Sequence, residues 1–388
     1  MSENIACPQT STPKNIVVFC DGTWNQPDQK TKEGGKPCPT NVAKLFEAVC
    51  PFDINGNPQL VHYLRGVGTR RMERIKGGGF GYGISDNIKE GYQFICSNYQ
   101  PGDRIYLFGF SRGAYTARSI AGFINNVGIL RKSLFYKTNE AFDHYRDNSK
   151  EWQPDAQNSI DYQKANGYLD DHGEPSKKIH FLGVWDTVGA LGAPYGVVIR
   201  WIIDKLFKCS FHHTDLSSSI ESAYHAVAMD EKRWPFRPTL WDQEAIDPAI
   251  RDNFEQIWFP GVHSDVGGGY PETALSDIPL NWMATKASHR GLCLDLNLVQ
   301  DPEVSPVPNS INAAANMHDS QTWLYRLATV LFVKLPSVLK IPLPSWDKKE
   351  AATDPIEIKR IDWNGNYNRA VPDDAKFDIT LTGSSQHP

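Results

Sequence analysis

The sequence has few of the features that mark disulfide-bonded, zinc-binding or secreted proteins. It contains seven cysteines, an odd number, and none of them forms a CxxC pair. A disulfide framework and a structural zinc site are therefore not expected. The polar N-terminus, MSENIACPQTSTPK, has no apolar signal-peptide core, which predicts synthesis in the cytoplasm. Export by a route that needs no cleaved signal stays compatible with this sequence.

Long apolar runs and an excess of basic residues are also missing. No stretch is long enough for a transmembrane helix, and the net charge of -5 argues against a nucleic-acid-binding protein. Hydrophobic residues make up 40% of the chain, enough for a sizeable core. We expect one catalytic domain over residues 14–340, with helical insertions at about 130–177 and 195–250. Residues 341–388 are expected to be a C-terminal extension packed on the same domain.

Short apolar runs alternate with amphipathic helical patterns along the first two thirds of the chain. Apolar side chains recur every three or four residues after Thr40, Ile84 and Ala114, which is typical of helices. This alternation predicts an α/β fold, mainly a parallel sheet with helices on both faces. The runs that predict strands are Asn15–Cys20, Gln59–Leu64, Arg104–Phe110, Lys178–Trp185 and Gln256–Pro260.

The strongest motif is G-x-S-x-G at residues 109–113, with Ser111 as its serine. It follows a predicted strand directly and precedes a predicted helix, as a nucleophile elbow requires. The glycines fit because a Cβ on either side of the serine would collide with the neighbouring strand or helix. The alternative is an ordinary strand-to-helix turn. The context favours a nucleophilic serine in an α/β-hydrolase fold.

A nucleophilic serine needs a base and an orienting acid, which follow it in this fold in the order acid, then histidine. Asp186 comes directly after one predicted strand and His263 after another. Since open α/β sheets gather site residues at the carboxyl ends of their strands, we predict the triad Ser111, Asp186 and His263. The chemistry requires no metal and no cofactor, although a calcium site made of carboxylates stays open.

Other histidines and one other acid compete for these roles. His180 begins its strand, at the wrong end for catalysis, and His225 lies in a helix predicted over residues 217–230. His318 lies outside any predicted strand. Asp265 follows His263 by two residues, a poor spacing for reaching the ring nitrogen that faces away from the serine. Asp186 could alternatively be a turn or helix-capping residue.

An oxyanion hole requires two preorganised N–H donors. The backbone N–H of Arg112, which follows the nucleophile, is one candidate. Gly22 or Thr23, in the loop after the first strand, is the other, although Asp-Gly at 21–22 is also a plain turn signal. We assign no catalytic role to Asp21.

Two further segments allow a structural and a functional interpretation. Residues 77–83 form a Gly-rich stretch that is neither a P-loop nor a dinucleotide fingerprint, and it could be a lid hinge or a plain loop. The apolar segment Val197–Phe207 suits an interfacial helix in peripheral contact with a membrane, or a buried helix. Packing favours the buried alternative. The sequence does not define an oligomeric state.

Five sequence blocks occur in the order of one known family: FCDGTWN, HYLRGVGT, GDRIYLFGFSRGAYTAR, VWDTVGALG and WFPGVHSDVGGGY. Together they resemble the catalytic domain of the type VI secretion phospholipase effectors, over roughly residues 14 to 285. The resemblance implies an α/β-hydrolase fold, with Ser111 as nucleophile, Asp186 as acid and His263 as base. It further implies phospholipase A-type ester hydrolysis and delivery into a competitor cell.

The predicted function is therefore a serine hydrolase that cleaves an ester or lipid substrate through an acyl-enzyme. The alternatives are an esterase on small soluble esters, an amidase or thioesterase on the same scaffold, and a non-catalytic binding module.

Overall fold

A computed structural model describes most of the first 300 residues of the chain. The described residues are 12–66 apart from 24, 26–27, 29 and 31–34; 80–189 apart from 148; 216–299 apart from 234, 235, 237 and 243–245; and His318 and Ser320. The segments predicted at 197–207 and 341–388, and residues 77–79 of the Gly-rich stretch, lie outside them.

The described part of the chain contains a six-stranded sheet in the order β2-β1-β3-β4-β5-β6, in which every neighbouring pair is parallel. All carboxyl ends therefore meet at one edge of the sheet, where open α/β sheets place their sites. The strands are β1 (Asn15–Cys20), β2 (Gln59–Leu64), β3 (Arg104–Phe110), β4 (Phe181–Trp185), β5 (Ala223–Ala228) and β6 (Phe254–Phe259).

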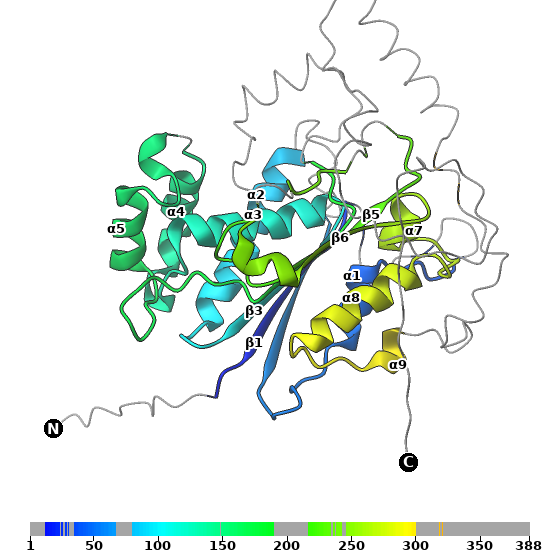
Figure 1. Ribbon diagram of the computed structural model, residues 1–388, viewed down its shortest axis with the longest axis horizontal. Helices are drawn as coiled ribbons and strands as arrows, with labels where there is room; N and C mark the ends of the chain where they lie inside the picture. The colour runs from blue at the N-terminus through cyan, green and yellow to red at the C-terminus, as the bar shows by residue number, and fades with distance from the viewer. Residues whose placement is uncertain are drawn as a thin grey trace, which may run out of the picture.

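Helices cover both faces of this sheet (Figure 1). Along β1 and β3, alternate side chains enter two different apolar clusters, one formed with α2 and α3 and the other with α1 and α8. This is the three-layer packing that a parallel sheet requires, because both of its faces must be buried. The helices are α1 (Asn41–Ala48), α2 (Phe80–Asn98), α3 (Arg112–Val127), α4 (Thr138–Tyr145), α5 (Gln157–Asn166), α7 (His263–Gly267), α8 (Asp277–His289) and α9 (Leu296–Val299), with 3-10 turns at Lys132–Lys137, Lys150–Trp152 and Pro248–Asn253.

The structure confirms the predicted parallel α/β architecture but corrects one element. Residues 223–228 were expected in a helix, whereas they form β5, between β4 and β6. The helix assignment was wrong because alanine is the best helix former and the polar run before it resembles an exposed helix face. All six residues of β5 are buried, so the alternation that identifies a half-buried strand is missing.

His225 on β5 is a buried neutral imidazole that belongs to the core. Its Nε2 accepts the backbone N–H of Thr187 at 3.2 Å, so its Nδ1 carries the proton and donates to Gln256 Oε1 at 2.9 Å. Burial, together with the positive charge of Arg118, lowers the pKa of His225 to about 3.

This histidine should make the protein less stable in mild acid. The unfolded chain takes up a proton near pH 6.5, and the folded protein only near pH 3, so stability is lost as the pH falls through this window. Between about pH 7.5 and about pH 5 we expect His225 alone to lower the free energy of unfolding by about 2 kcal/mol. Urea denaturation at both pH values should show a shallower dependence in His225→Gln, and an unchanged dependence would contradict the prediction.

Candidate active site

Ser111 lies in a sharp turn between β3 and α3, at the carboxyl edge of the sheet. Its φ of 58° and ψ of -124° are strained for a residue with a side chain. Two close approaches explain the flanking glycines: a Cβ on Gly109 would lie 2.5 Å from the Gly113 carbonyl oxygen, and a Cβ on Gly113 would lie 2.1 Å from that of Cys20. The turn is further held by the Ser111 N–H, which donates to the Trp185 carbonyl at 3.0 Å. The geometry is that of a nucleophile elbow.

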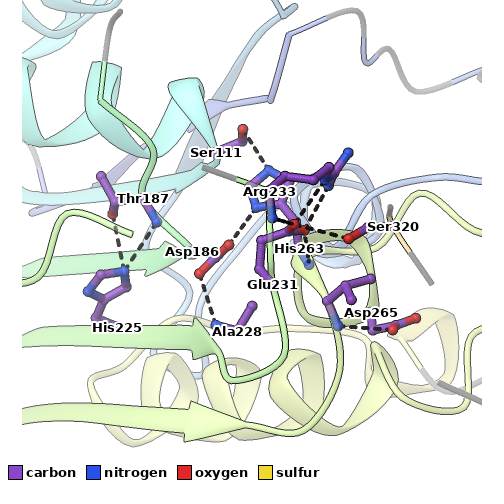
Figure 2. Close-up of polar contacts among 11 residues, drawn as sticks. Ser111, Asp186, Thr187, His225, Ala228, Glu231, Arg233, His263, Asp265 and Ser320 are labelled. Carbon is purple, nitrogen blue, oxygen red and sulfur yellow. Dashed lines mark hydrogen bonds and ion pairs between the residues drawn. The ribbon is translucent and has the colours of Figure 1, made fainter. Parts of the chain in front are cut away.

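The three residues predicted as a triad come together at this turn (Figure 2). His263 begins α7, just after β6, and its Nε2 lies 2.8 Å from Ser111 Oγ. Its Nδ1 lies 2.5 Å from Asp186 Oδ2, at the end of β4. Because a carboxylate accepts the Nδ1 proton, Nε2 is left with its lone pair toward the serine hydroxyl. Such an arrangement can remove a proton from Ser111.

Asp186 is held firmly in place. Its side chain is fully buried, its φ of 38° is positive, and its Oδ1 accepts the backbone N–H of Ala228 at 2.9 Å. This bond from the end of β5 fixes which carboxylate oxygen faces His263. The His263 ring also packs against the ring of Phe110, with 4.6 Å between the two centroids. The imidazole is thus held by both a polar and an apolar contact.

The loop after β1 lies directly beside the serine. A Cβ on Gly22 would be 3.2 Å from Ser111 Cβ and 2.8 Å from Asn25 Nδ2, so a side chain at this position would require its neighbours to shift. The Gly22 N–H already donates to Asp21 Oδ1 at 2.7 Å, which favours Thr23 as the donor from this loop. The Thr23 hydroxyl is buried and has no hydrogen-bond partner within the described residues. Arg112, the other predicted donor, begins α3 immediately after Ser111.

Asp21 anchors the loop that carries these donors. Its carboxylate accepts hydrogen bonds from Tyr63 and from Thr40, which caps α1, as well as from Gly22. Burial raises the pKa of Asp21 to about 6, despite the opposing effect of these hydrogen bonds. The side chain therefore ties β1, β2 and α1 together behind the candidate oxyanion hole.

The competing residues contact other groups. His180, before β4, lies 2.7 Å from Glu221 and is bound to the Arg290 carbonyl, and His225 belongs to the core. The carboxylate of Asp265 accepts the backbone N–H of Val262 at 3.0 Å and lies 2.6 Å from His318 Nδ1. His318 thus contacts α7, the helix that begins at His263, through Asp265.

One residue near His263 had no sequence prediction. Glu231, just beyond β5, accepts the backbone N–H of His263 at 3.3 Å. Had residues 223–228 been assigned as a strand, Glu231 would have followed its carboxyl end and would have been a candidate. Among the residues that the structure describes, no group of three or more His, Cys, Asp or Glu side chains could hold a metal ion. No described helix is long and apolar enough to span a lipid bilayer.

A parallel sheet with a strained serine between strand and helix, an acid after a later strand and a histidine after the last described strand defines an α/β-hydrolase. Residues 14–286 match the family model described as T6SS phospholipase effector Tle1-like, catalytic domain. The chain therefore belongs to this family of phospholipase-type hydrolase domains.

Individual relatives are more distant. An uncharacterized protein of Saccharomyces cerevisiae is 32% identical over 248 residues, which cover 59% of this chain and 33% of the yeast protein. A crystal structure of an uncharacterized protein from Pseudomonas aeruginosa is 22% identical, with a TM-score of 0.44, over 85% of this chain and 51% of that one. A structure of the Tle1 effector bound to the VgrG spike is 20% identical, with a TM-score of 0.39, over 68% of this chain and 52% of that one. The chain thus spans a third to about half of these relatives.

Proposed function

We propose that this protein is a serine hydrolase that cleaves carboxylic esters through an acyl-enzyme. The observation that carries the proposal is the continuous contact from Ser111 Oγ through the His263 imidazole to the Asp186 carboxylate, at 2.8 and 2.5 Å. Such a relay converts a weakly nucleophilic hydroxyl into an effective one.

In the first half of the reaction, Ser111 Oγ attacks the ester carbonyl carbon while His263 Nε2 takes the hydroxyl proton. Asp186 stabilises the imidazolium that results. The backbone N–H groups of Arg112 and of Thr23 or Gly22 are the proposed donors to the tetrahedral oxyanion. The intermediate then collapses: the bond to the alcohol oxygen breaks, and that oxygen leaves with the proton from His263.

In the second half, a water molecule replaces the alcohol. His263 takes a proton from the water as its oxygen attacks the acyl carbon, and the second tetrahedral intermediate releases the carboxylic acid while Ser111 regains its proton. Family membership favours a lipid ester, in a reaction of lipase or phospholipase A type, as substrate. A short soluble ester would use the same steps.

The test is hydrolysis of short p-nitrophenyl esters and of phospholipid vesicles, measured side by side, with labelling of Ser111 by a fluorophosphonate. Cleavage of both substrates and labelling of Ser111 are expected. Cleavage of the soluble esters alone would keep the serine mechanism and remove the lipid substrate. Cleavage of neither, without labelling, would overturn the proposal and favour a binding module; labelling without ester cleavage would point to amides or thioesters.

A further inference from the structure

Glu231 is a buried carboxylate next to the base, and the mechanism above assigns it no role. It follows β5, between the strands that carry Asp186 and His263. Its side chain is 1% exposed, and its Oε2 accepts the backbone N–H of His263 (Figure 2). Burying a charged group costs free energy unless the group is paired and hydrogen-bonded, so this carboxylate requires partners inside the protein.

Arg233 pairs with this carboxylate in a forked arrangement. Its Nε lies 2.9 Å from Glu231 Oε1 and its Nη2 lies 2.8 Å from Oε2, while the Arg233 backbone N–H also donates to Oε1 at 2.7 Å. Burial raises the pKa of Glu231, but the hydrogen bonds and charge of Arg233 outweigh it, and the pKa lies below its ordinary value. Glu231 is therefore an ionised carboxylate beside the imidazole at neutral pH.

The same pair is connected to the histidine ring itself. The guanidinium of Arg233 lies 3.8 Å from the centroid of the Phe236 ring, and the edge-on contact between Phe236 and His263 spans 5.0 Å. Ser320, outside the residues that match the family model, donates to Glu231 Oε1 at 3.0 Å. The Glu231 carboxylate thus contacts the His263 backbone, the Arg233 guanidinium and Ser320, which is distant in the sequence.

We propose that Glu231 is a positioning residue for His263: its carboxylate, held by Arg233, fixes the backbone of the base and places a negative charge near the imidazolium that forms during acyl transfer. This rests on the serine-hydrolase function proposed above. Within the part of the chain that the structure describes, charged groups near His263 also include Asp186 against the ring, Arg233 beside Glu231, Asp265 with its partner His318, and Asp230, which accepts the Gly261 N–H at 2.9 Å.

Replacing each member of the pair should shift the pH dependence of kcat/KM in opposite directions. Glu231→Gln keeps the shape and an acceptor oxygen but removes the negative charge between Arg233 and the base, so the base binds a proton less readily. We expect its acid limb to move to lower pH by roughly half a unit or more, with kcat lowered by about tenfold. Arg233→Gln leaves an uncompensated carboxylate, and its acid limb should move to higher pH.

The double variant Glu231→Gln/Arg233→Gln removes both charges and should return the acid limb close to that of the wild type. A purely structural role would not produce opposite shifts that cancel. Glu255→Gln, which removes a carboxylate on β6 paired with Lys286, is the matched control and should leave the limb in place. Circular dichroism of each variant reports whether it folds, and Arg233→Gln and the double variant keep the test open if Glu231→Gln does not.

Unmoved limbs in folded single variants, or shifts in the same direction, would overturn the role of Glu231. Proton uptake by the His263 ring can also be followed by NMR, without turnover, and its midpoint should move as the acid limb does. A wild type that hydrolyses no ester would overturn the proposed function instead. The NMR midpoints would still decide whether Glu231 acts on His263, so the two failures are distinguishable.

Discussion

Replacing Ser111 by alanine is expected to lower kcat for ester hydrolysis by at least about 10⁴-fold, because it removes the proposed nucleophile, on which the whole relay acts. The fold should survive, since the turn is held by the backbone contact to Trp185 and by the close approaches at Gly109 and Gly113. Initial rates on a p-nitrophenyl ester, with thermal unfolding of the same samples, measure both effects.

Two further variants separate the loss of the hydroxyl from any loss of structure. Ser111→Gly also removes the proposed nucleophile but suits the positive φ of the turn, so it should be as inactive as alanine and at least as stable as the wild type. Ser119→Ala removes a buried hydroxyl further along α3 and should keep most of the activity. A Ser111→Ala protein with the wild-type rate would rule out the serine mechanism.

Asp186→Asn is expected to lower kcat by about 10³- to 10⁴-fold. The Ala228 N–H binds Oδ1 and will select the amide oxygen for that position. The amide nitrogen must then face His263 Nδ1, where it can only donate. The imidazole would have to place its proton on Nε2, toward Ser111, in the tautomer that cannot accept the serine proton.

Asp265→Asn is the matched control, because Asp265 is also buried and lies only two residues from His263. It contacts Val262 and His318 rather than the imidazole, so its replacement should cost less than about tenfold in kcat. Rates for both variants across the same pH range distinguish the two acids. A larger loss in Asp265→Asn than in Asp186→Asn would assign the orienting role to Asp265.

The strands with strongly apolar sequences could be predicted closely. Asn15–Cys20, Gln59–Leu64 and Arg104–Phe110 have the predicted bounds, and Lys178–Trp185 begins three residues later, at Phe181. Strand β5 itself could not be predicted, because its sequence AYHAVA has no alternation and contains three alanines. Burial on both faces, a property of the whole sheet, makes this segment a strand.

The same limit applied to the site. Ser111 stood out because its motif, strand and helix are contiguous, and Asp186 and His263 stood out because each follows a strand. Glu231 follows the strand that was taken for a helix, so nothing local singled it out. The choice of Thr23 over Gly22 as a donor also depends on a contact of Asp21, which no sequence pattern encodes.

The parallel sheet has a consequence for how activity is gained during folding. Ser111 and His263 are 152 residues apart in the chain, and Asp186 and His263 are 77 apart. Contacts between such distant segments form slowly, because the intervening chain must lose its freedom before the contacts stabilise it. Helices can form earlier because their hydrogen bonds are local, whereas the relay exists only when β6 has docked on β5. During refolding, recovered hydrolysis should therefore lag behind recovered helical content and report the completed sheet.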